Sequence, residues 1–333
     1  MNINDLNLRQ KIAQMFITGF EGKIPEDCFN KLLSLGLGGV IFFTQNIESE
    51  MQFKKLISDI SQKAQIPMFY SIDQEGGRVE RTENIYGGKK YLSAKYAYEK
   101  GLEYLKNQTK EIALELKNYG INMNFAPVLD VNTNFENPII GERSFSDKPE
   151  KVIEATKTVL KEYEKYGIIT VGKHFPGHGA SSSDSHKTLP VIDLTVEELK
   201  TIHIKPFTEA IKIGCPAIMA AHVSYPALDG TNTPASVSEK IINELLIQEL
   251  GFNGVIITDD MEMNGIKKYT RLEACIKAIN AGVNMFIFRS ASPDIITLID
   301  NLEKSVKDNI IPLGKINFSV EKIIKLKKLY KLL

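Results

Sequence analysis

Short apolar runs recur along the chain, and each is followed by a longer segment in which charged and apolar residues alternate at helical spacing. Several runs, such as GVIFF at residues 39–43 and MFIF at 285–288, are apolar throughout, which is typical of strands buried on both faces of a parallel sheet. The predicted strands are Met15–Thr18, Gly39–Phe43, Met68–Ile72, Asn122–Phe125, Ile168–Gly172, Ala217–Ala221, Gly254–Thr258 and Met285–Phe288.

Helices are predicted between these strands, for example over residues 151–166 and 198–213. A β-then-α unit that recurs so many times favours a closed barrel over an open sheet. The chain has 333 residues, and an α/β barrel typically needs roughly 250. We therefore predict an α/β fold, a single (β/α)8 TIM-type barrel, as one domain over residues 1–333.

The last residues, SVEKIIKLKKLYKLL at 319–333, combine apolar residues at helical spacing with lysines. This pattern allows a helix that lies on a membrane surface, or a last helix that covers the barrel and turns its lysines to solvent. We favour the covering helix.

Charge and composition exclude several classes of protein. The 41 Lys and Arg residues balance 41 Asp and Glu residues, whereas nucleic-acid binders usually show a basic excess. Asp5, Arg9 and Lys11 stand where a signal peptide would need an apolar stretch, and no run approaches the roughly 18 residues of a membrane span. We expect a cytoplasmic protein that binds neither nucleic acid nor a membrane.

The cysteines, Cys28, Cys215 and Cys275, are far apart, odd in number and in no C-x-x-C motif. A disulfide framework or a cysteine-based zinc site is therefore not expected, and reduced thiols are.

Polar residues follow the predicted strands at the end where a barrel gathers its chemistry. The carboxyl ends of the strands share one rim of the barrel. So many polar residues at this one rim are not explained by the chance polarity of a protein surface. The residues are Asp73, Asp130, Glu142, Arg143, Lys173, His174, His222, Asp259, Asp260 and Arg289.

The segment KHFPGHGASSSDSHKTLP, residues 173–190, holds three of the five histidines. Its residues His174, His178, Asp184 and His186 have the chemistry of a metal site. Alternatively, Asp184 lies two residues from His186 and could make that imidazole an acid and base near neutrality. A third interpretation is that the histidines only hold the loop together. The glycines and serines indicate a loop that can move.

Asp259 and Asp260 follow the seventh predicted strand, so one carboxylate should face the barrel mouth while the other turns away or caps the next element. An inward carboxylate facing a mobile acid/base is an arrangement for glycoside hydrolysis, although a helix N-cap is the simpler interpretation of an Asp pair. Side chains suited to sugar hydroxyls, or to ion pairs that brace the rim, are Asp73, Arg81, Arg143, Lys173 and His174.

Five motifs together resemble the family 3 glycoside hydrolases, and within that family the single-domain bacterial β-N-acetylglucosaminidases. The resemblance covers nearly the whole chain in order, and the long histidine motif is highly specific. The motifs are DQEGGRVER (73–81), NFAPVLDV (124–131), IGERSFS (140–146), KHFPGHGASSSDSH (173–186) and TDDMEM (258–263).

The resemblance implies roles for individual residues. Asp259 matches the nucleophile, and His186, paired with Asp184, matches the acid/base. It also implies a retaining exo-enzyme that needs no metal or organic cofactor, lacks a C-terminal sandwich domain and works as a monomer. The implied substrate is a GlcNAc-anhydro-muropeptide from cell-wall turnover. Segment 82–90 departs from the family pattern, so the identity of the aglycone is left open. The implied sugar-binding residues are Asp73, Arg81, Arg143, Lys173 and His174.

Three alternatives stay beside this interpretation. A neutral imidazole does not repel an anion as a carboxylate would, so phosphate could replace water as acceptor and give GlcNAc-1-phosphate. A metal-dependent hydrolase built on His174, His178, Asp184 and His186 would instead lose activity with a chelator, and a sugar-binding protein would need no nucleophile at Asp259.

Overall fold

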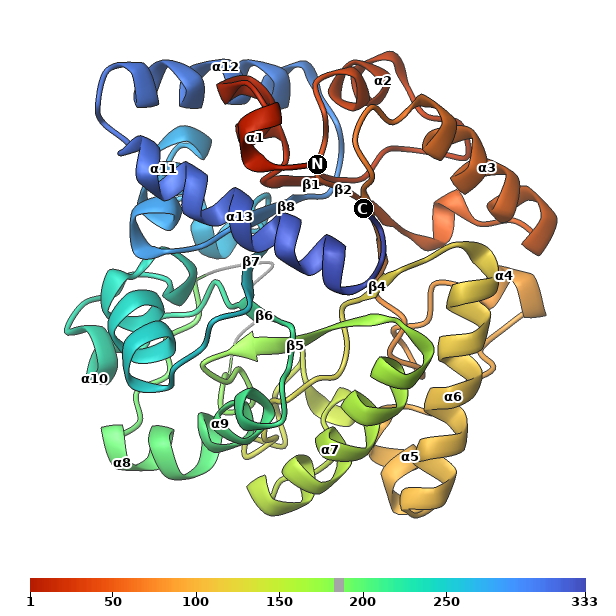
Figure 1. The fold of residues 1–333 in the computed structure, drawn as a ribbon. Helices are drawn as coiled ribbons and strands as arrows, with labels where there is room; N and C mark the ends of the chain where they lie inside the picture. The colour runs from red at the N-terminus through yellow and green to blue at the C-terminus, as the bar shows by residue number, and fades with distance from the viewer. Residues whose placement is uncertain (183–188) are drawn as a thin grey trace.

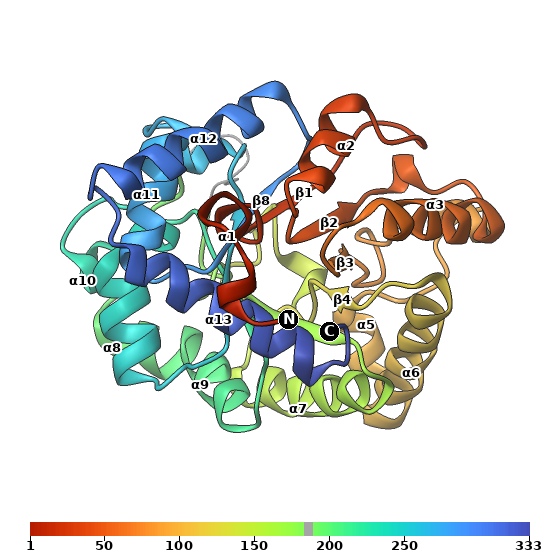
Figure 2. The same cartoon turned by 45° about the horizontal axis from the view of Figure 1, so that its top comes forward.

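The computed structural model describes residues 1–182 and 189–333, which form a closed barrel of parallel strands surrounded by helices (Figures 1 and 2). Each strand pairs with its neighbours in sequence, and β1 also pairs with β8, which closes the barrel. The predicted (β/α)8 fold is thereby confirmed. The strands are β1 (Phe16–Thr18), β2 (Gly39–Phe42), β3 (Phe69–Ile72), β4 (Met123–Asn124), β5 (Ile169–Phe175), β6 (Ala217–Ala220), β7 (Val255–Asp260) and β8 (Met285–Phe288).

The predicted strands all form, and the largest differences lie at the carboxyl ends of β5 and β7. The prediction ended β5 at Gly172 and β7 at Thr258, because charged residues follow each position. In the structure, β5 continues through Lys173 and His174, and β7 includes Asp259 and Asp260. Ion pairs and hydrogen bonds inside the barrel mouth satisfy these polar side chains, so the strands need not end before them.

Helices cover the outside of the barrel, and their apolar faces pack on the strands (Figure 1). Short 3-10 turns lie in several connections. The α-helices are α1 (Leu8–Ala13), α2 (Asp27–Ser34), α3 (Glu50–Lys63), α4 (Glu83–Tyr86), α5 (Ala94–Glu99), α6 (Leu102–Tyr119), α7 (Pro149–Tyr166), α8 (Val196–Glu198), α9 (Lys205–Lys212), α10 (Pro226–Asp229), α11 (Arg271–Ala281), α12 (Pro293–Lys307) and α13 (Leu313–Leu329); wider π-helical turns span Leu199–His203 and Lys240–Glu249.

The helix predicted over residues 198–213 is not continuous. The short α8 passes into the π-helical turn Leu199–His203, and a new helix, α9, begins at Lys205. Pro206 explains the restart, because a proline has no N–H to donate to the preceding turn and is tolerated at the first turn of a helix. The helix predicted over 151–166 does form, as α7.

The last helix, α13, crosses the amino-terminal end of the barrel beside α1 (Figures 1 and 2). It is the predicted covering helix, but the prediction that its lysines face solvent is wrong for two of them. Lys327 is fully buried, and its Nζ donates to Gln14 Oε1 over 2.7 Å. Lys322 is 8 % exposed and donates to the Gly254 carbonyl over 3.1 Å. Both lysines thereby help to close this end of the barrel.

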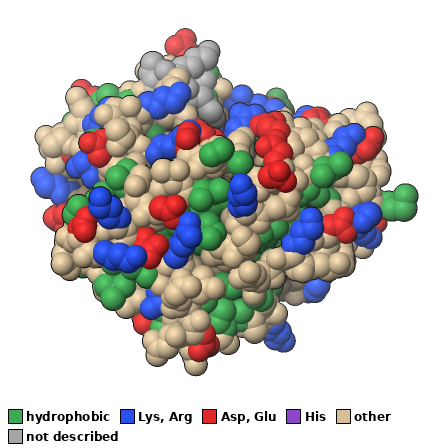
Figure 3. All heavy atoms as spheres, turned by 90° about the horizontal axis from the view of Figure 1, so that it is seen from above, with side chains coloured by type: hydrophobic (Ala, Val, Ile, Leu, Met, Phe, Trp, Pro, Cys, Tyr) green, Lys and Arg blue, Asp and Glu red, His purple; other side chains and the backbone are tan. Residues whose placement is uncertain are grey.

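The surface carries charges of both signs. On the face shown in Figure 3, Lys and Arg side chains are interspersed with Asp and Glu side chains. In the described part of the chain, no helix is both long and apolar enough to span a bilayer. The cysteines carry free thiols, with Cys215 and Cys275 buried and Cys28 partly buried.

Candidate active site

A cavity of about 380 Å³ opens at the carboxyl ends of the strands. Its size lies in the range of small-molecule sites, and both charged and apolar side chains line it. Apolar contacts come from Phe43, Phe125, Met219 and Met263, among others. The charged and histidine side chains are Asp73, Arg78, Arg81, Arg143, Lys173, His174, His178, Asp259, Asp260 and Arg289.

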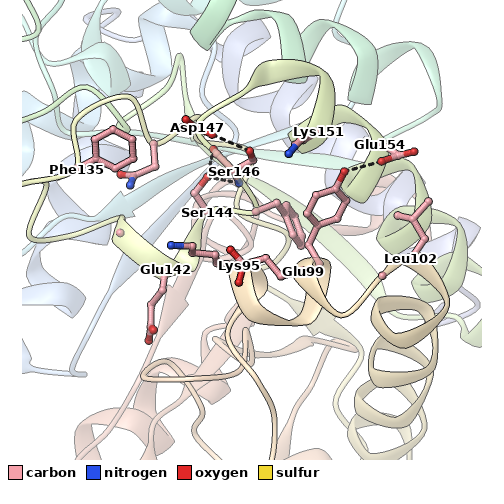
Figure 4. A pocket seen from close by; sticks show the side chains of 15 residues that line it. Lys95, Glu99, Leu102, Phe135, Glu142, Ser144, Ser146, Asp147, Lys151 and Glu154 are labelled. Atoms are coloured by element: carbon pink, nitrogen blue, oxygen red, sulfur yellow. Dashed lines mark hydrogen bonds between the residues drawn. The ribbon is translucent and has the colours of Figure 1, made fainter.

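A larger hollow of about 850 Å³ lies between α5, α7 and the loop after β4 (Figure 4). Several of its polar side chains bond one another or the backbone: Tyr98 donates to Glu154 over 2.6 Å, and Ser144 donates to the Asp130 carbonyl. Glu142, one of the residues predicted at the functional rim, lines this hollow, but none of the predicted catalytic or sugar-binding residues that the structure describes does so. The smaller cavity is therefore the candidate active site.

A continuous chain of charges forms one wall of the cavity. Lys173 Nζ lies 2.6 Å from Asp73 Oδ1 and 2.6 Å from Glu75 Oε1. Arg143 donates two hydrogen bonds of 2.8 Å to the same Glu75 carboxylate. The Arg81 guanidinium lies 3.7 Å from Asp73 Oδ2. Burial disfavours the charged carboxylate, but the cations of Arg143 and Lys173 outweigh that effect and hold the pKa of Glu75 well below its usual range. The wall is thus a fixed array of ions at neutral pH.

The turn after β3 brings Asp73 and Glu75 into this wall. Gly76 adopts φ +96°, and a side chain there would meet the Leu92 carbonyl at 2.3 Å, so glycine is required. The Gln74 backbone N–H donates to the Asn124 side chain over 2.9 Å, and the Gln74 side chain accepts the Arg81 N–H over 2.8 Å. These buried bonds fix both ends of the segment that carries the charged side chains.

Asp130, after β4, organises the histidines at the end of β5. Its Oδ2 lies 2.7 Å from His174 Nδ1, and its Oδ1 accepts the His178 backbone N–H over 2.6 Å. Burial opposes ionisation of Asp130, but its close contact with His174 and the His178 backbone N–H hold the pKa of this carboxyl below its usual value. An ionised carboxylate only accepts, so His174 Nδ1 carries the proton. Burial, together with the neighbouring His174, lowers the pKa of His178 to about 4, so His178 is neutral.

Asp259 and Asp260 end β7 at the cavity, on the opposite side from the charged wall. Asp260 accepts the Glu262 backbone N–H over 3.0 Å within the turn that follows β7. The prediction that one carboxylate turns away or caps the next element is wrong, because both line the cavity and the 3-10 turn Asn264–Ile266 has no side-chain cap. Burial raises the pKa of Asp260 to about 6. His222 Nε2 lies 3.2 Å from the Asp259 carbonyl and 3.1 Å from that of Asp260, and its Nδ1 bonds Ser236. The buried imidazole therefore holds the backbone that presents both carboxylates.

The structure brings most of the predicted site residues together. Asp73, Arg81, Arg143, Lys173, His174 and Asp259 all line the one cavity. Asp184 and His186 lie outside the described residues, so the predicted acid/base pair stays a prediction.

Sequence reasoning missed Glu75 and Phe43. Glu75 stands two positions after Asp73 in the motif DQEGGRVER. Its position close to the end of a predicted strand could therefore have identified it as a site residue. Phe43 was assigned only to a strand, and nothing in the sequence marked its ring as part of the cavity wall.

The metal hypothesis rests partly on the same undescribed residues. Among residues 1–182 and 189–333, no group of three or more His, Cys, Asp or Glu side chains could hold a metal ion. His174 and His178 each bond Asp130 instead.

Residues 7–326 match the glycosyl hydrolase family 3 N-terminal domain. The chain belongs to glycoside hydrolase family 3. This family 3 chain is 36 % identical over 283 residues to beta-hexosaminidase A of Pseudoalteromonas piscicida, covering 79 % of its own length but 47 % of that relative. It is 34 % identical to a beta-hexosaminidase of Haemophilus influenzae strain Rd, with 85 % and 81 % of the two chains covered.

Solved structures agree. A glycoside hydrolase family 3 beta-N-acetylglucosaminidase from Paenibacillus sp. superposes with a TM-score of 0.93 at 35 % identity, over 98 % of this chain and 63 % of that chain. The family 3 chain thus spans about half of the Pseudoalteromonas protein and under two thirds of the Paenibacillus one. The predicted family is confirmed.

Proposed function

We propose that this protein is a retaining exo-β-N-acetylglucosaminidase that removes a terminal β-linked GlcNAc. The observation that carries the proposal is the position of Asp259, which lines one cavity together with Asp73, Lys173 and Arg143. Glu75 pairs with both Lys173 and Arg143 and so holds these cations in the wall. A carboxylate for the anomeric carbon and a rigid polar wall for the hydroxyl groups are the two parts that such a reaction requires. The beta-hexosaminidase names of the relatives support the choice of sugar.

The reaction has two steps. In the first, Asp259 attacks the anomeric carbon while protonated His186 gives its proton to the departing oxygen. In the second, neutral His186 takes a proton from water, and the water displaces Asp259 from the sugar. The Asp184 carboxylate would hold the His186 imidazole in the right tautomer and favour its cation.

The charged wall recognises the sugar. Asp73 presents carboxylate oxygens to hydroxyl groups, while Lys173 and Arg143 donate to oxygen atoms and carry no acceptor of their own. Because these side chains already hold one another, little conformational entropy is lost when the sugar binds. His174, with its Nδ1 proton held by Asp130, offers Nε2 as an acceptor.

We further propose that the barrel acts alone as a cytoplasmic monomer, without metal or organic cofactor, on GlcNAc-anhydro-muropeptides. This part rests on the likeness of the five motifs to the single-domain bacterial members of the family.

The test is hydrolysis of 4-nitrophenyl β-GlcNAc by the wild type and by Asp259→Asn. We expect kcat to fall on the order of 10⁴-fold in the variant, because a residue that acts within a catalytic unit typically costs that much. Asp300→Asn, which removes an exposed carboxylate paired with Arg9, is the matched control and should keep its activity. Full activity in Asp259→Asn would refute the assignment.

Three further measurements separate the alternatives. Proton NMR of the first-formed sugar should show the β-anomer, as a retaining enzyme requires. Activity should survive EDTA, whereas loss to EDTA would restore the metal-dependent hydrolase. GlcNAc-1-phosphate formed at millimolar phosphate would identify a phosphorylase, and free GlcNAc alone would identify a hydrolase.

A further inference from the structure

A separate cavity of about 510 Å³ opens at the amino-terminal end of the barrel and shares no lining residue with the candidate active site. The turns that lead into β6 and β7, residues 214–216 and 251–254, form the floor of this amino-terminal cavity. The last helix, α13, forms one wall, and the end of α9 borders it (Figure 1). Its volume lies in the range of sites for small molecules.

Backbone hydrogen bonds hold the floor in place. The Val255 N–H donates to the Pro216 carbonyl over 3.1 Å. The Phe252 N–H donates to the Leu246 carbonyl over 3.1 Å. A side chain at Gly254 would meet the Pro216 carbonyl at 2.4 Å and the Phe252 ring at 2.6 Å, so the two turns approach this closely because the residue is glycine. The floor is therefore preformed, and a ligand would not need to order it.

The walls of the amino-terminal cavity are largely hydrocarbon. Phe252 and Leu326 line it with buried side chains, and Ile211 lines it with a partly buried one. At the rim, Phe318 is 48 % exposed and Leu329 is 70 % exposed. Single exposed apolar residues are ordinary, but these two border an apolar cavity, so an apolar ligand would remove them from water together with the walls.

Lys322 places a positive charge in this apolar setting. The residue is 8 % exposed, and its Nζ donates to the Gly254 carbonyl over 3.1 Å and lies 4.9 Å from the centroid of the Phe318 ring. Burial, together with the charge of Lys325, lowers the pKa of Lys322 to about 8. Among the described residues the ammonium has one acceptor for three donors and no carboxylate partner. An anion at Nζ would supply both the acceptors and the opposite charge.

The remaining charges of the cavity favour a ligand with a single negative group. Lys325, Glu164 and Glu321 also line the cavity, and all three are exposed. With Lys322 they make two cations and two carboxylates, so the cavity as a whole does not attract a polyanion. A sugar would place hydroxyl groups against apolar side chains without partners, which is costly.

We propose that the amino-terminal cavity binds a small amphipathic acid, with its carboxylate at Lys322 Nζ and its hydrocarbon part against Phe252 and Leu326. The carboxylate forms charge-assisted hydrogen bonds with the ammonium, and the hydrocarbon leaves water for the apolar walls. The site goes beyond the proposed glycosidase reaction and does not depend on it.

The chain contains no tryptophan, so Leu329→Trp introduces a single fluorescent reporter at the rim. Octanoate below its micelle concentration should shift the emission saturably, and 1-octanol should bind about tenfold more weakly because it brings no charge to Lys322. Affinity should rise about three- to fourfold for each methylene group from hexanoate to decanoate. Leu313→Trp, at an exposed position of the same helix outside the cavity, is the control and should not respond. Titration calorimetry of the wild type with octanoate measures the same affinity without a reporter.

Lys322→Met, combined with Leu329→Trp, separates the contact with the carboxylate from the apolar contacts. The preference for octanoate over 1-octanol should fall about tenfold, while binding of 1-octanol is retained and shows that the cavity is intact. Lys328→Met, at an exposed lysine of the same helix that does not line the cavity, should keep the preference.

Three outcomes would overturn the inference. One is the absence of saturable octanoate binding by both fluorescence and calorimetry, or a preference for the acid that Lys322→Met leaves unchanged. Another is an equal response of Leu313→Trp, which would indicate detergent-like binding over the surface. The third is a concentration-dependent dimer in sedimentation velocity that Leu329→Arg abolishes, because a second copy of the chain would then cover the cavity.

Discussion

Lys173 and Glu75 form an ion pair inside the barrel mouth, with 2.6 Å between Nζ and Oε1 and with both side chains at most 4 % exposed. Glu75 is bound in the same way by Arg143, so one carboxylate neutralises much of the charge of two buried cations. The pair is the centre from which the polar wall is built.

Glu75→Gln should therefore destabilise the protein and weaken substrate binding. Removing one partner of a buried pair leaves uncompensated charge and typically costs about 3–5 kcal/mol. Urea denaturation at pH 7 should show this loss, and KM for 4-nitrophenyl β-GlcNAc should rise because Lys173 and Arg143 are no longer held. Glu50→Gln, at an exposed pair with Lys54, is the control and should leave the urea midpoint close to that of the wild type. Wild-type stability in Glu75→Gln would contradict this account.

His222 should act on kcat more than on KM. Its Nε2 holds the carbonyls of Asp259 and Asp260, whereas no sugar contact is proposed for it. We expect His222→Phe to lower kcat on the order of 10²-fold, because small displacements of a reacting group are costly. His203→Phe, at another buried histidine, serves as control for general damage. An equal loss in both variants would mean that His222 acts only through stability.

Substitution of His186 should depend on the leaving group. A general acid contributes about 10²–10⁴-fold in rate, and it matters most when the departing oxygen is basic. His186→Ala should therefore lose far more kcat/KM on phenyl β-GlcNAc than on 2,4-dinitrophenyl β-GlcNAc, with folding unchanged by circular dichroism. Equal losses on the two substrates would remove His186 from proton transfer.

Asp260 should make stability fall as pH rises from about 4 to about 6. Burial raises the folded-state pKa to about 6 from an ordinary value near 4, so the folded state binds the proton more tightly in that interval. At pH 7 the charged form costs on the order of 2–3 kcal/mol, and Asp260→Asn should recover part of it. Thermal unfolding at pH 4 and pH 7 measures the effect, with Asp294→Asn as an exposed control. A variant whose gain is the same at both pH values would refute the linkage.

Lys327 should make stability rise between about pH 7 and pH 10. Burial lowers its folded-state pKa to about 7, so over this interval the unfolded chain binds a proton that the folded protein does not. Lys327→Met should stabilise the protein at pH 7 by on the order of 2–4 kcal/mol, and the gain should shrink towards pH 10, where only the bond to Gln14 is lost. Lys325→Met, at an exposed position on the same helix, should show no such dependence.

Hydrophobic pattern determined most of the fold, because each strand of this barrel is a short apolar run buried on both faces. The pattern failed where polar side chains are buried in pairs. Lys173 and Asp259 marked expected strand ends, yet β5 and β7 continue through them. Lys327 was likewise predicted to face solvent because it is charged, yet its side chain is buried. A lysine next to leucines carries no local signal of the partner, which lies far away in the sequence.

The candidate site was predicted largely through its motifs rather than through geometry. Spacing alone allowed metal binding, proton transfer or a structural loop for the histidine segment. The contacts of Asp130 with His174 and His178, across 44 and 48 residues, could not be deduced from that spacing. Neither could the approach of Arg289 to Phe43, because it depends on the closure of β8 onto β1.

The two ends of the chain lie side by side (Figures 1 and 2), with Lys328 Nζ 3.5 Å from Asn2 Oδ1. They lie at the amino-terminal end of the barrel, whereas the active-site cavity opens at the carboxyl ends of the strands. A tether fused to either terminus would therefore attach the molecule to a solid support by the amino-terminal end of its barrel. The entrance to the active-site cavity would then face away from the support. Surface immobilisation and affinity tagging become orientation-controlled without any redesign of the barrel.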